Sequence, residues 1–137
     1  HRPIMIHRAI YGSFERFVGI LTEHFAGNFP AWIAPVQVAV LPLTDAQKDY
    51  AKSVYDTLFS EGFRVYLDDR SEKVNYKIRE AENRKIPYML VLGPKEEQSG
   101  SVSLRIHGAG DKGAFELKEF MQKVRLNVTA KKTKYDL

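Results

Sequence analysis

The sequence predicts an α/β fold in which a mostly parallel sheet is flanked by helices. The segments 36–43, 63–67 and 88–92 are short and rich in apolar residues, as buried parallel strands are. Between them lie longer segments whose apolar residues recur at helical spacing. Alternation of strand and helix favours a parallel sheet, because each parallel connection needs a crossover. The length of 137 residues suits one such domain with an appended segment.

The first predicted helix covers residues 13–25 and is followed by a linker. Ser13 is a suitable N-cap for this helix, whose apolar side chains are Phe14, Phe17, Val18, Leu21 and Phe25. The segment AGNFPAWIAP, residues 26–35, then contains a glycine and two prolines, which interrupt regular structure. We expect this linker to connect two units, and the residues that should hold it against a surface are Phe29, Trp32 and Ile33.

A second helix should follow the first strand. Thr44 and Gln47 match a capping box, with a hydroxyl at the N-cap and a glutamine three residues later. Gly62 stands where helices commonly end, and the strand Phe63–Leu67 comes next. The residues that this helix should bury are Tyr50, Ala51, Val54, Tyr55, Leu58 and Phe59.

A third helix is expected near residues 73–85, because Pro87 blocks its continuation before the next strand. Residues 93–100 contain a Gly-Pro and a Ser-Gly pair, which indicate a turn region. The segment SVSLRI, residues 101–106, alternates apolar and polar side chains. Such alternation suits an edge strand or an antiparallel strand.

The last helix is expected over residues 113–127, directly after a glycine-rich loop. Its apolar face would be formed by Ala114, Leu117, Met121, Val124 and Val128. The loop GAGDKG, residues 108–113, matches the GxGxxG fingerprint of dinucleotide sites. That fingerprint also needs a second strand with an acidic residue about 20 residues on, and no such strand is predicted. We therefore interpret the loop as a turn followed by a helix start.

Composition restricts the possible chemistry. The chain has no cysteine, which excludes disulfides, thiol catalysis and cysteine-based zinc sites within it. Its net charge of +4 mildly favours an anionic partner such as nucleic acid. No apolar run approaches the roughly 18 residues of a membrane span, and residues 1–6 lack a signal-peptide pattern. We therefore expect a cytoplasmic protein with no membrane partner. No metal-ligand spacing relates the histidines His1, His7, His24 and His107.

The helix at 73–85 is the strongest candidate for an RNA-binding surface. At helical spacing one stripe carries the cations Lys73, Lys77 and Arg84, and another carries the apolar residues that should face the sheet: Val74, Ile78 and Ala81. Arg79 lies on neither stripe. Its planar fork can bind two base acceptors at once, whereas lysine acts as a point charge. The alternative is that Arg79 pairs on the surface with an acidic neighbour, Glu72, Glu80 or Glu82.

Three polar residues from consecutive elements could meet at one end of the sheet. They are Arg79, Glu96 and Arg105. Unpaired RNA bases are recognised by hydrogen bonds to their edges, and two guanidinium groups with one carboxylate supply both donors and an acceptor. We therefore hypothesise that these three residues surround one unpaired base.

Two segments resemble a known family. The segment IHRAIYGSFERFVGILTEHFAGNFPAWIAPVQV, residues 6–38, is similar to the end of the catalytic domain of threonyl-tRNA synthetases. The segment EKVNYKIREAENRKIPYMLVLG, residues 72–93, resembles the core of their anticodon-binding domain. The resemblance implies a mixed five-stranded sheet with three helices. It divides the chain into a catalytic-domain end with linker (1–34), an anticodon-binding domain (35–128) and a basic tail (129–137).

For the first part, the resemblance implies a remnant of a catalytic site. Gly12–Arg16 is similar to motif 3 of class II synthetases, so Ser13 and Arg16 would belong to the ATP site and Arg16 would contact ATP. His7 corresponds to a zinc-binding histidine whose companion ligands lie upstream in that family. The parent enzyme would use zinc and Mg-ATP to attach threonine to tRNA, as a homodimer through its catalytic domain. The isolated chain is not expected to aminoacylate, since one histidine cannot hold catalytic zinc.

For the second part, the resemblance implies recognition of the anticodon of tRNA(Thr). Arg79, Glu96 and Arg105 correspond to base-reading residues. Ser71 stands where an asparagine can occur and Lys85 where an arginine can occur, and a lysine keeps a phosphate contact but loses a bidentate base contact. Lys73 and Lys77 are expected to bind phosphates. Two alternatives are nucleotide chemistry of the chain's own and an accessory domain that keeps the fold but has lost RNA binding.

Overall fold

A five-stranded sheet forms the centre of the protein in the computed structural model, which describes residues 1–135. The strand order is β2-β1-β3-β4-β5. β1 pairs in parallel with β2 and β3, while β4 is antiparallel to both β3 and β5. The mixed five-stranded sheet is therefore confirmed, although parallel pairings do not predominate. The strands are β1 (Val38–Pro42), β2 (Val65–Leu67), β3 (Tyr88–Leu92), β4 (Ser101–Ile106) and β5 (Gly110–Glu116).

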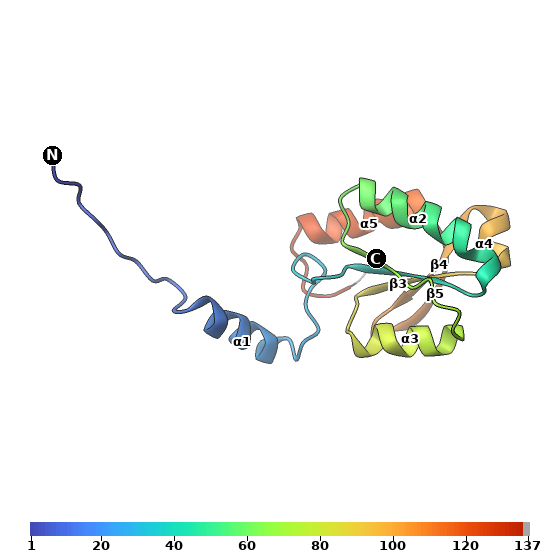
Figure 1. Ribbon diagram of the computed structural model, residues 1–137, viewed down its shortest axis with the longest axis horizontal. Coiled ribbons are helices and arrows are strands. Elements are labelled where there is room, and N and C mark those ends of the chain that lie inside the picture. The colour runs from blue at the N-terminus through green and yellow to red at the C-terminus, as the bar shows by residue number, and fades with distance from the viewer. Residues whose placement is uncertain (136–137) are drawn as a thin grey trace.

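Helices cover both faces of the sheet, as Figure 1 shows. α2 and α5 lie on one face and α3 lies on the other, while the short α4 connects β3 to β4. α1 stands apart from the sheet, and the residues before it extend further away. The helices are α1 (Phe14–His24), α2 (Lys48–Ser60), α3 (Val74–Asn83), α4 (Pro94–Ser99) and α5 (Leu117–Thr129), with a 3₁₀ turn η1 (Asp45–Gln47) before α2.

The two faces of the sheet bury different cores. Alternate residues of β1, β3 and β4 pack against α2 and α5, with Tyr88, Leu104 and Phe120 fully buried. The opposite face of β1 and β3 packs against α3 through a smaller set of residues: Ala39, Leu41, Ala81, Ile86 and Met89. Tyr66 of β2 also packs against this cluster, so α3 covers β1, β2 and β3, and β4 and β5 are left without a helix on this side.

The expected helix at 113–127 is wrong in its first turns. Residues 110–116 form β5, and α5 begins at Leu117. Gly110 and Gly113 adopt positive φ angles of 71° and 89°, which permit a tight hairpin and a bulge opposite β4. Pairing with β4 then uses the backbone of this segment, so Ala114 lies in a strand. The glycine-rich loop is the turn of a β-hairpin and opens no helix.

Three further local expectations are corrected. Residues 94–99 form α4 rather than a turn, and Pro94 is suited to its first position. Thr44 makes no capping bond to the backbone, because its hydroxyl donates to the Gln47 side chain (2.6 Å) and α2 starts only at Lys48. Phe59 is 63% exposed and stacks on Tyr55 instead of entering the core.

The linker packs on the edge of the sheet where the parallel strands β1, β2 and β3 begin. We call this the amino edge, and we call the edge where these three strands end the carboxyl edge. Gln37 and Arg64 donate side-chain hydrogen bonds to the carbonyl of Ala31 at 2.8 and 3.1 Å. Ala31 and Ala34 are buried. In contrast, α1 has the expected N-cap, where the Ser13 hydroxyl accepts from the Arg16 N–H (3.2 Å), but it buries no residue.

Within residues 1–135 no helix is long and apolar enough to cross a bilayer. The expected cytoplasmic location stays a prediction.

Candidate nucleic-acid interface

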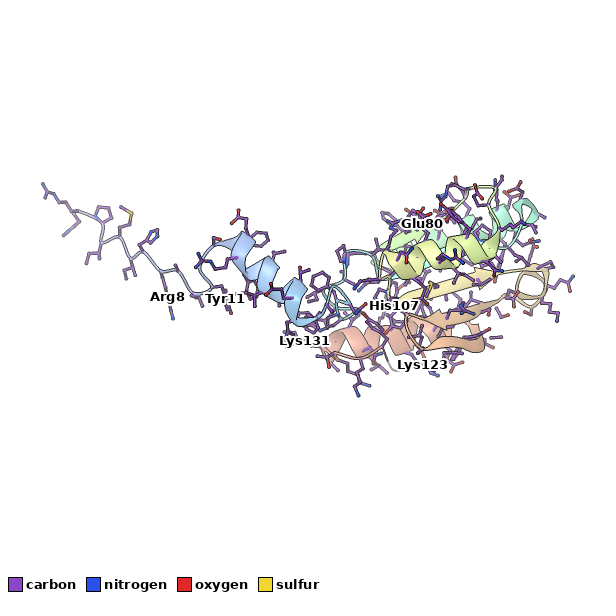
Figure 2. All side chains as sticks on the ribbon, turned by 90° about the horizontal axis from the view of Figure 1, so that it is seen from below. Arg8, Tyr11, Glu80, His107, Lys123 and Lys131 are labelled. Carbon is purple, nitrogen blue, oxygen red and sulfur yellow. The ribbon has the colours of Figure 1, made fainter. Side chains whose placement is uncertain are left out.

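The surface of β4 and β5 beside α3 is uncovered and mostly lined by small or polar side chains. In Figure 2 the strands lie exposed next to α3. We call this surface the open sheet face. Buried Leu104 and Ile106 of β4 point to the other side, so their neighbours on β4 and the residues paired with them on β5 form this face. It consists of Ser101, Ser103, Arg105, Asp111, Ala114 and Glu116.

Arg105 is the principal cation of the open sheet face. Its side chain is half-buried, and its Nε is shielded from solvent without a hydrogen-bond partner among the described residues. Its guanidinium also forms no ion pair there. Buried donors almost always have a partner, because an unpaired one costs about 1–3 kcal/mol. This guanidinium is therefore free to bind a ligand.

Arg79 is exposed on α3 and is also uncommitted. The alternative of a surface pair does not hold, because no ion pair joins Arg79 to Glu72, Glu80 or Glu82 among the described residues. Glu80 binds Arg70 (2.8 Å), and Glu82 lies 2.6 Å from the imidazole Nδ1 of His107. These pairs also orient the helix, since Arg70 follows β2 while His107 follows β4. In Figure 2 the labels Glu80 and His107 lie on opposite sides of α3. Arg79 and Glu82 are neighbours at helical spacing, and Arg79 lies about 160° around the helix axis from buried Ala81, so Arg79 faces solvent on the β4 side of α3.

Glu96 lies at the carboxyl edge of the sheet, in the first turn of α4. Its Oε2 accepts a hydrogen bond from the N–H of Gly93 (3.0 Å) and so caps the N-terminus of α4. Its Oε1 has no partner among the described residues. Ser101 is the residue of β4 next to α4, and Arg105 is four residues further along, about 13 Å at strand spacing. No hydrogen bond or ion pair joins any two of Arg79, Glu96 and Arg105 within residues 1–135. Their arrangement around one base therefore stays a prediction.

Ser71 belongs to a polar cluster at the same edge. Its hydroxyl donates to the carboxylate of Asp45 (2.9 Å), and the ammonium of Lys48 donates to the hydroxyl (3.3 Å). Asp45 lies 26 positions earlier in the chain and was not identified from the sequence, because no local pattern links the two. The pKa of Asp45 is lowered by its hydrogen bonds from Lys48 and Ser71. Lys73 lies close by as the exposed N-cap residue of α3.

Lys77 does not belong to an exposed phosphate-binding stripe, contrary to the sequence prediction. It is 2% exposed, and its ammonium donates to the carbonyls of Pro42 and Asp68, both at 3.2 Å. Burial lowers the pKa of this lysine although the carboxylate of Asp68 opposes the shift. The side chain thus ties α3 to the ends of β1 and β2 and cannot meet a phosphate in this arrangement.

Lys85 lies at the opposite, amino edge of the sheet. Its ammonium donates to the carbonyl of Ala26 in the linker and lies beside Gly27. This contact explains why a lysine is suited to the position, but it also occupies the charge that was expected to bind RNA. The RNA contact of Lys85 stays a prediction, and it would need the bond to Ala26 to be shared or broken.

The residues expected in a catalytic site lie far from this interface. Ser13 and Arg16 start α1, and exposed His7 lies in the extended segment before it. Within residues 1–135 no three His, Cys, Asp or Glu side chains gather closely enough to hold a metal ion. The described part of the chain therefore does not fit a zinc ion by itself.

Comparison with known proteins identifies the fold. Residues 37–127, which include β1–β5 and α2–α5 up to its last turn, match the family described as the anticodon binding domain. The chain belongs to the anticodon-binding domain family. The RNA binding domain of threonyl-tRNA synthetase from Cryptosporidium parvum superposes on this anticodon-binding domain with a TM-score of 0.80 at 30% identity, over 92% of this chain and 30% of that one. Prolyl-tRNA synthetase from the same organism gives a TM-score of 0.65 at 25% identity, over 74% and 22%.

Full-length relatives of this anticodon-binding domain are threonine–tRNA ligases. That of Caldanaerobacter subterraneus is 56% identical over 96% of this chain, and that of Clostridium tetani is 55% identical over 93%. In both, the match covers 20% of the relative, so the chain spans about a fifth of the length of these ligases. The match extends well beyond the family region at 37–127, so the α1 and linker segments also resemble threonine–tRNA ligases.

Proposed function

We propose that this domain recognises the anticodon of tRNA(Thr) as part of a ligase that attaches threonine to tRNA with ATP. The observation that carries the proposal is the pair of uncommitted guanidinium groups, Arg105 on the open sheet face and Arg79 on the solvent side of α3. Membership of the anticodon-binding domain family and the threonine–tRNA ligase relatives support it.

The interface has the chemistry that unpaired bases require. A guanidinium fork donates to two acceptors on a base edge, and the free Oε1 of Glu96 can accept from an exocyclic amine or ring N–H. The small side chains of Ser103 and Ala114, which pair across the hairpin, leave room for a base that is splayed out of its stack. Ser71 and Lys73 at the carboxyl edge would bind the neighbouring backbone or base. In contrast to Lys77, the ammonium of Lys73 is exposed and free for a phosphate.

The segment before the domain would complete a catalytic site elsewhere in the full-length ligase. Arg16 is exposed on α1 and would bind a phosphate of ATP, with Ser13 holding the start of that helix. His7 would contribute to a zinc site whose other ligands come from outside this chain, since residues 1–135 offer no cluster of three. The ligase would be a cytoplasmic homodimer through its catalytic domain.

Replacing Arg105 with Ala tests the proposal. The loss of a bidentate base contact should weaken binding of an RNA hairpin carrying the tRNA(Thr) anticodon loop by about 1–3 kcal/mol. The titration is measured by fluorescence anisotropy at two salt concentrations, with hairpins that differ at single anticodon bases. Phosphate contacts alone would give salt dependence without base preference.

Lys118→Ala is the matched control, because Lys118 is an exposed cation of α5 on the opposite face of the sheet. This variant should bind the hairpin as the unaltered protein does, apart from the small effect of one lost charge. Equal binding of all hairpins by the unaltered protein would contradict anticodon recognition.

A further inference from the structure

We propose that Asp111 is a specificity-determining residue that presents a carboxylate acceptor beside the guanidinium of Arg105, so that the two together select an unpaired guanine. This inference rests on the proposed function and adds a residue that the sequence analysis did not identify. Arg105 and Asp111 are six positions apart in the chain and face each other across the β4–β5 hairpin.

The register of the hairpin places the two side chains on one face. Leu104 pairs with Gly113, whereas Arg105 pairs with Asp111, so Lys112 is the extra residue of a bulge. Directly opposed residues of an antiparallel pair point to the same side of the sheet. Leu104 belongs to the core beneath α2 and α5, and Arg105 and Asp111 therefore both project from the open sheet face.

The carboxylate of Asp111 is held in place but remains partly free. Its Oδ1 accepts the N–H of Gly113 (2.8 Å), which fixes the side chain against its own turn. Its Oδ2 has no partner within residues 1–135. Asp111 and Arg105 form no ion pair there, since no nitrogen of Arg105 lies within 4.0 Å of a carboxylate oxygen. A donor fork and an acceptor thus stand side by side without satisfying each other.

This combination favours a base edge over a phosphate. A phosphate group is repelled by a carboxylate, so a site for phosphate alone gains nothing from Asp111. A guanine base offers the acceptors O6 and N7 to an arginine fork, and it carries N1–H and N2–H donors on the adjoining edge. The carboxylate can accept from those donors while the guanidinium binds the acceptors. The other bases lack two adjacent N–H donors beside an acceptor pair.

The test is the base preference of Asp111→Asn. The amide oxygen of asparagine still accepts from the Gly113 N–H, so the turn is kept, but an NH₂ donor replaces the free acceptor. Binding is measured with anticodon-loop hairpins in which each anticodon base in turn is changed to the other three. We expect the unaltered chain to prefer guanine at one position by about a hundredfold, and Asp111→Asn to reduce that preference to about tenfold, because the Arg105 fork still binds O6 and N7.

Asp49→Asn is the matched control, because Asp49 is an exposed carboxylate on α2, which covers the opposite face. Both variants remove one negative charge and should bind all hairpins slightly more tightly, but only Asp111→Asn should lower the preference for guanine. Asp111→Glu should restore part of it. An undiminished guanine preference in Asp111→Asn would overturn the inference and leave anticodon recognition standing. If the unaltered chain prefers no base, the inference and the proposed function both fail.

Discussion

Charged residues of the sheet and of α3 differ in whether their charge is bound within the fold or left for a ligand. Lys77 and Asp68 are 2% and 1% exposed, and their charges hold strand ends and loops together. Arg79 and Arg105 form no ion pair among the described residues and are left for a ligand. Helical spacing alone placed Lys77 on a cationic stripe and Arg79 outside both stripes, and it predicted that both are available to RNA. The difference arises from the ends of β1 and β2, whose carbonyl groups at Pro42 and Asp68 bind the ammonium of Lys77.

Replacing Asp68 with Asn should destabilise the fold at neutral pH. The carboxylate of Asp68 accepts two hydrogen bonds from the Arg70 guanidinium at 2.6 and 2.8 Å. Breaking a buried pair costs 3–5 kcal/mol, and because Arg70 is 40% exposed we expect a loss of about 2 kcal/mol in the free energy of unfolding. Urea denaturation measures it. Asp69→Asn, an exposed neighbour, is the control and should change stability by less than about 0.5 kcal/mol.

The effect of Asp68→Asn should depend on pH. Burial by itself raises the pKa of Asp68, but hydrogen bonds from Arg70 outweigh it, and the pKa lies below its ordinary value of 3.8. The stabilisation is therefore complete above the unfolded pKa and is lost as pH falls through the lower folded pKa. The stability difference between the unaltered chain and Asp68→Asn should shrink below about pH 4. A difference that is constant down to pH 3 would contradict the role of the ionised carboxylate.

At the scale of elements, the helices and strands that the sequence placed best are those with strong amphipathic patterns. α2, α3, β1 and β3 lie within a few residues of their expected positions. α4 was not predicted because a helix of six residues is too short to show a clear apolar periodicity. The Gly-Pro pair before it is also as typical of a turn as of a helix start. β5 was not predicted because its strand conformation depends on pairing with β4. The helical spacing of Leu117, Met121, Val124 and Val128 predicts α5 but contains no information on that pairing.

The turn from α4 into β4 depends on Gly100. This residue has a φ of 65°, and a Cβ added to it would meet nothing within 4 Å. Gly100→Ala should therefore lower the free energy of unfolding by about 1 kcal/mol through backbone conformation alone. Thermal unfolding followed by circular dichroism measures the change.

Gly19→Ala is the opposite case and serves as the control. Gly19 lies within α1 with open space around it, and alanine favours a helix by up to about 1 kcal/mol over glycine. We expect more helical signal in the far-ultraviolet circular dichroism and no loss of thermal stability. A similar destabilisation by both substitutions would contradict the role of the positive φ at Gly100.

At the scale of the whole molecule, the linker belongs to the folded unit. Arg64 donates from its Nε to the carbonyl of Ala34 (2.7 Å), and the Tyr135 hydroxyl donates to the carbonyl of Phe29 (2.9 Å). His107 Nε2 lies 2.8 Å from the Asn28 side-chain oxygen. We therefore propose that the folded domain begins near residue 26 rather than at 35. Part of the basic tail also packs on the domain through Tyr135, while residues 136–137 of that tail lie outside the described residues.

Two truncations test this domain boundary. A chain that begins at residue 26 should unfold at nearly the same urea concentration as the full chain, because α1 buries no residue. A chain that begins at residue 36 loses buried Ala31 and Ala34 and the carbonyl partners of Gln37 and Arg64. At about 1 kcal/mol for each hydrogen bond, we expect it to be less stable by about 3–5 kcal/mol. Equal stability of the two truncated chains would place the boundary at the linker's end.

The sequence by itself determined the α/β class, the main helices and strands, and the candidate base-reading residues Arg79 and Arg105. These follow from periodicity and residue chemistry, which are local properties of the chain. Only the tertiary structure decided that Lys77 is buried, that Lys85 binds the linker and that Asp111 stands opposite Arg105. Each of these depends on pairings between segments far apart in the chain or on the register of a hairpin, and no local pattern encodes either.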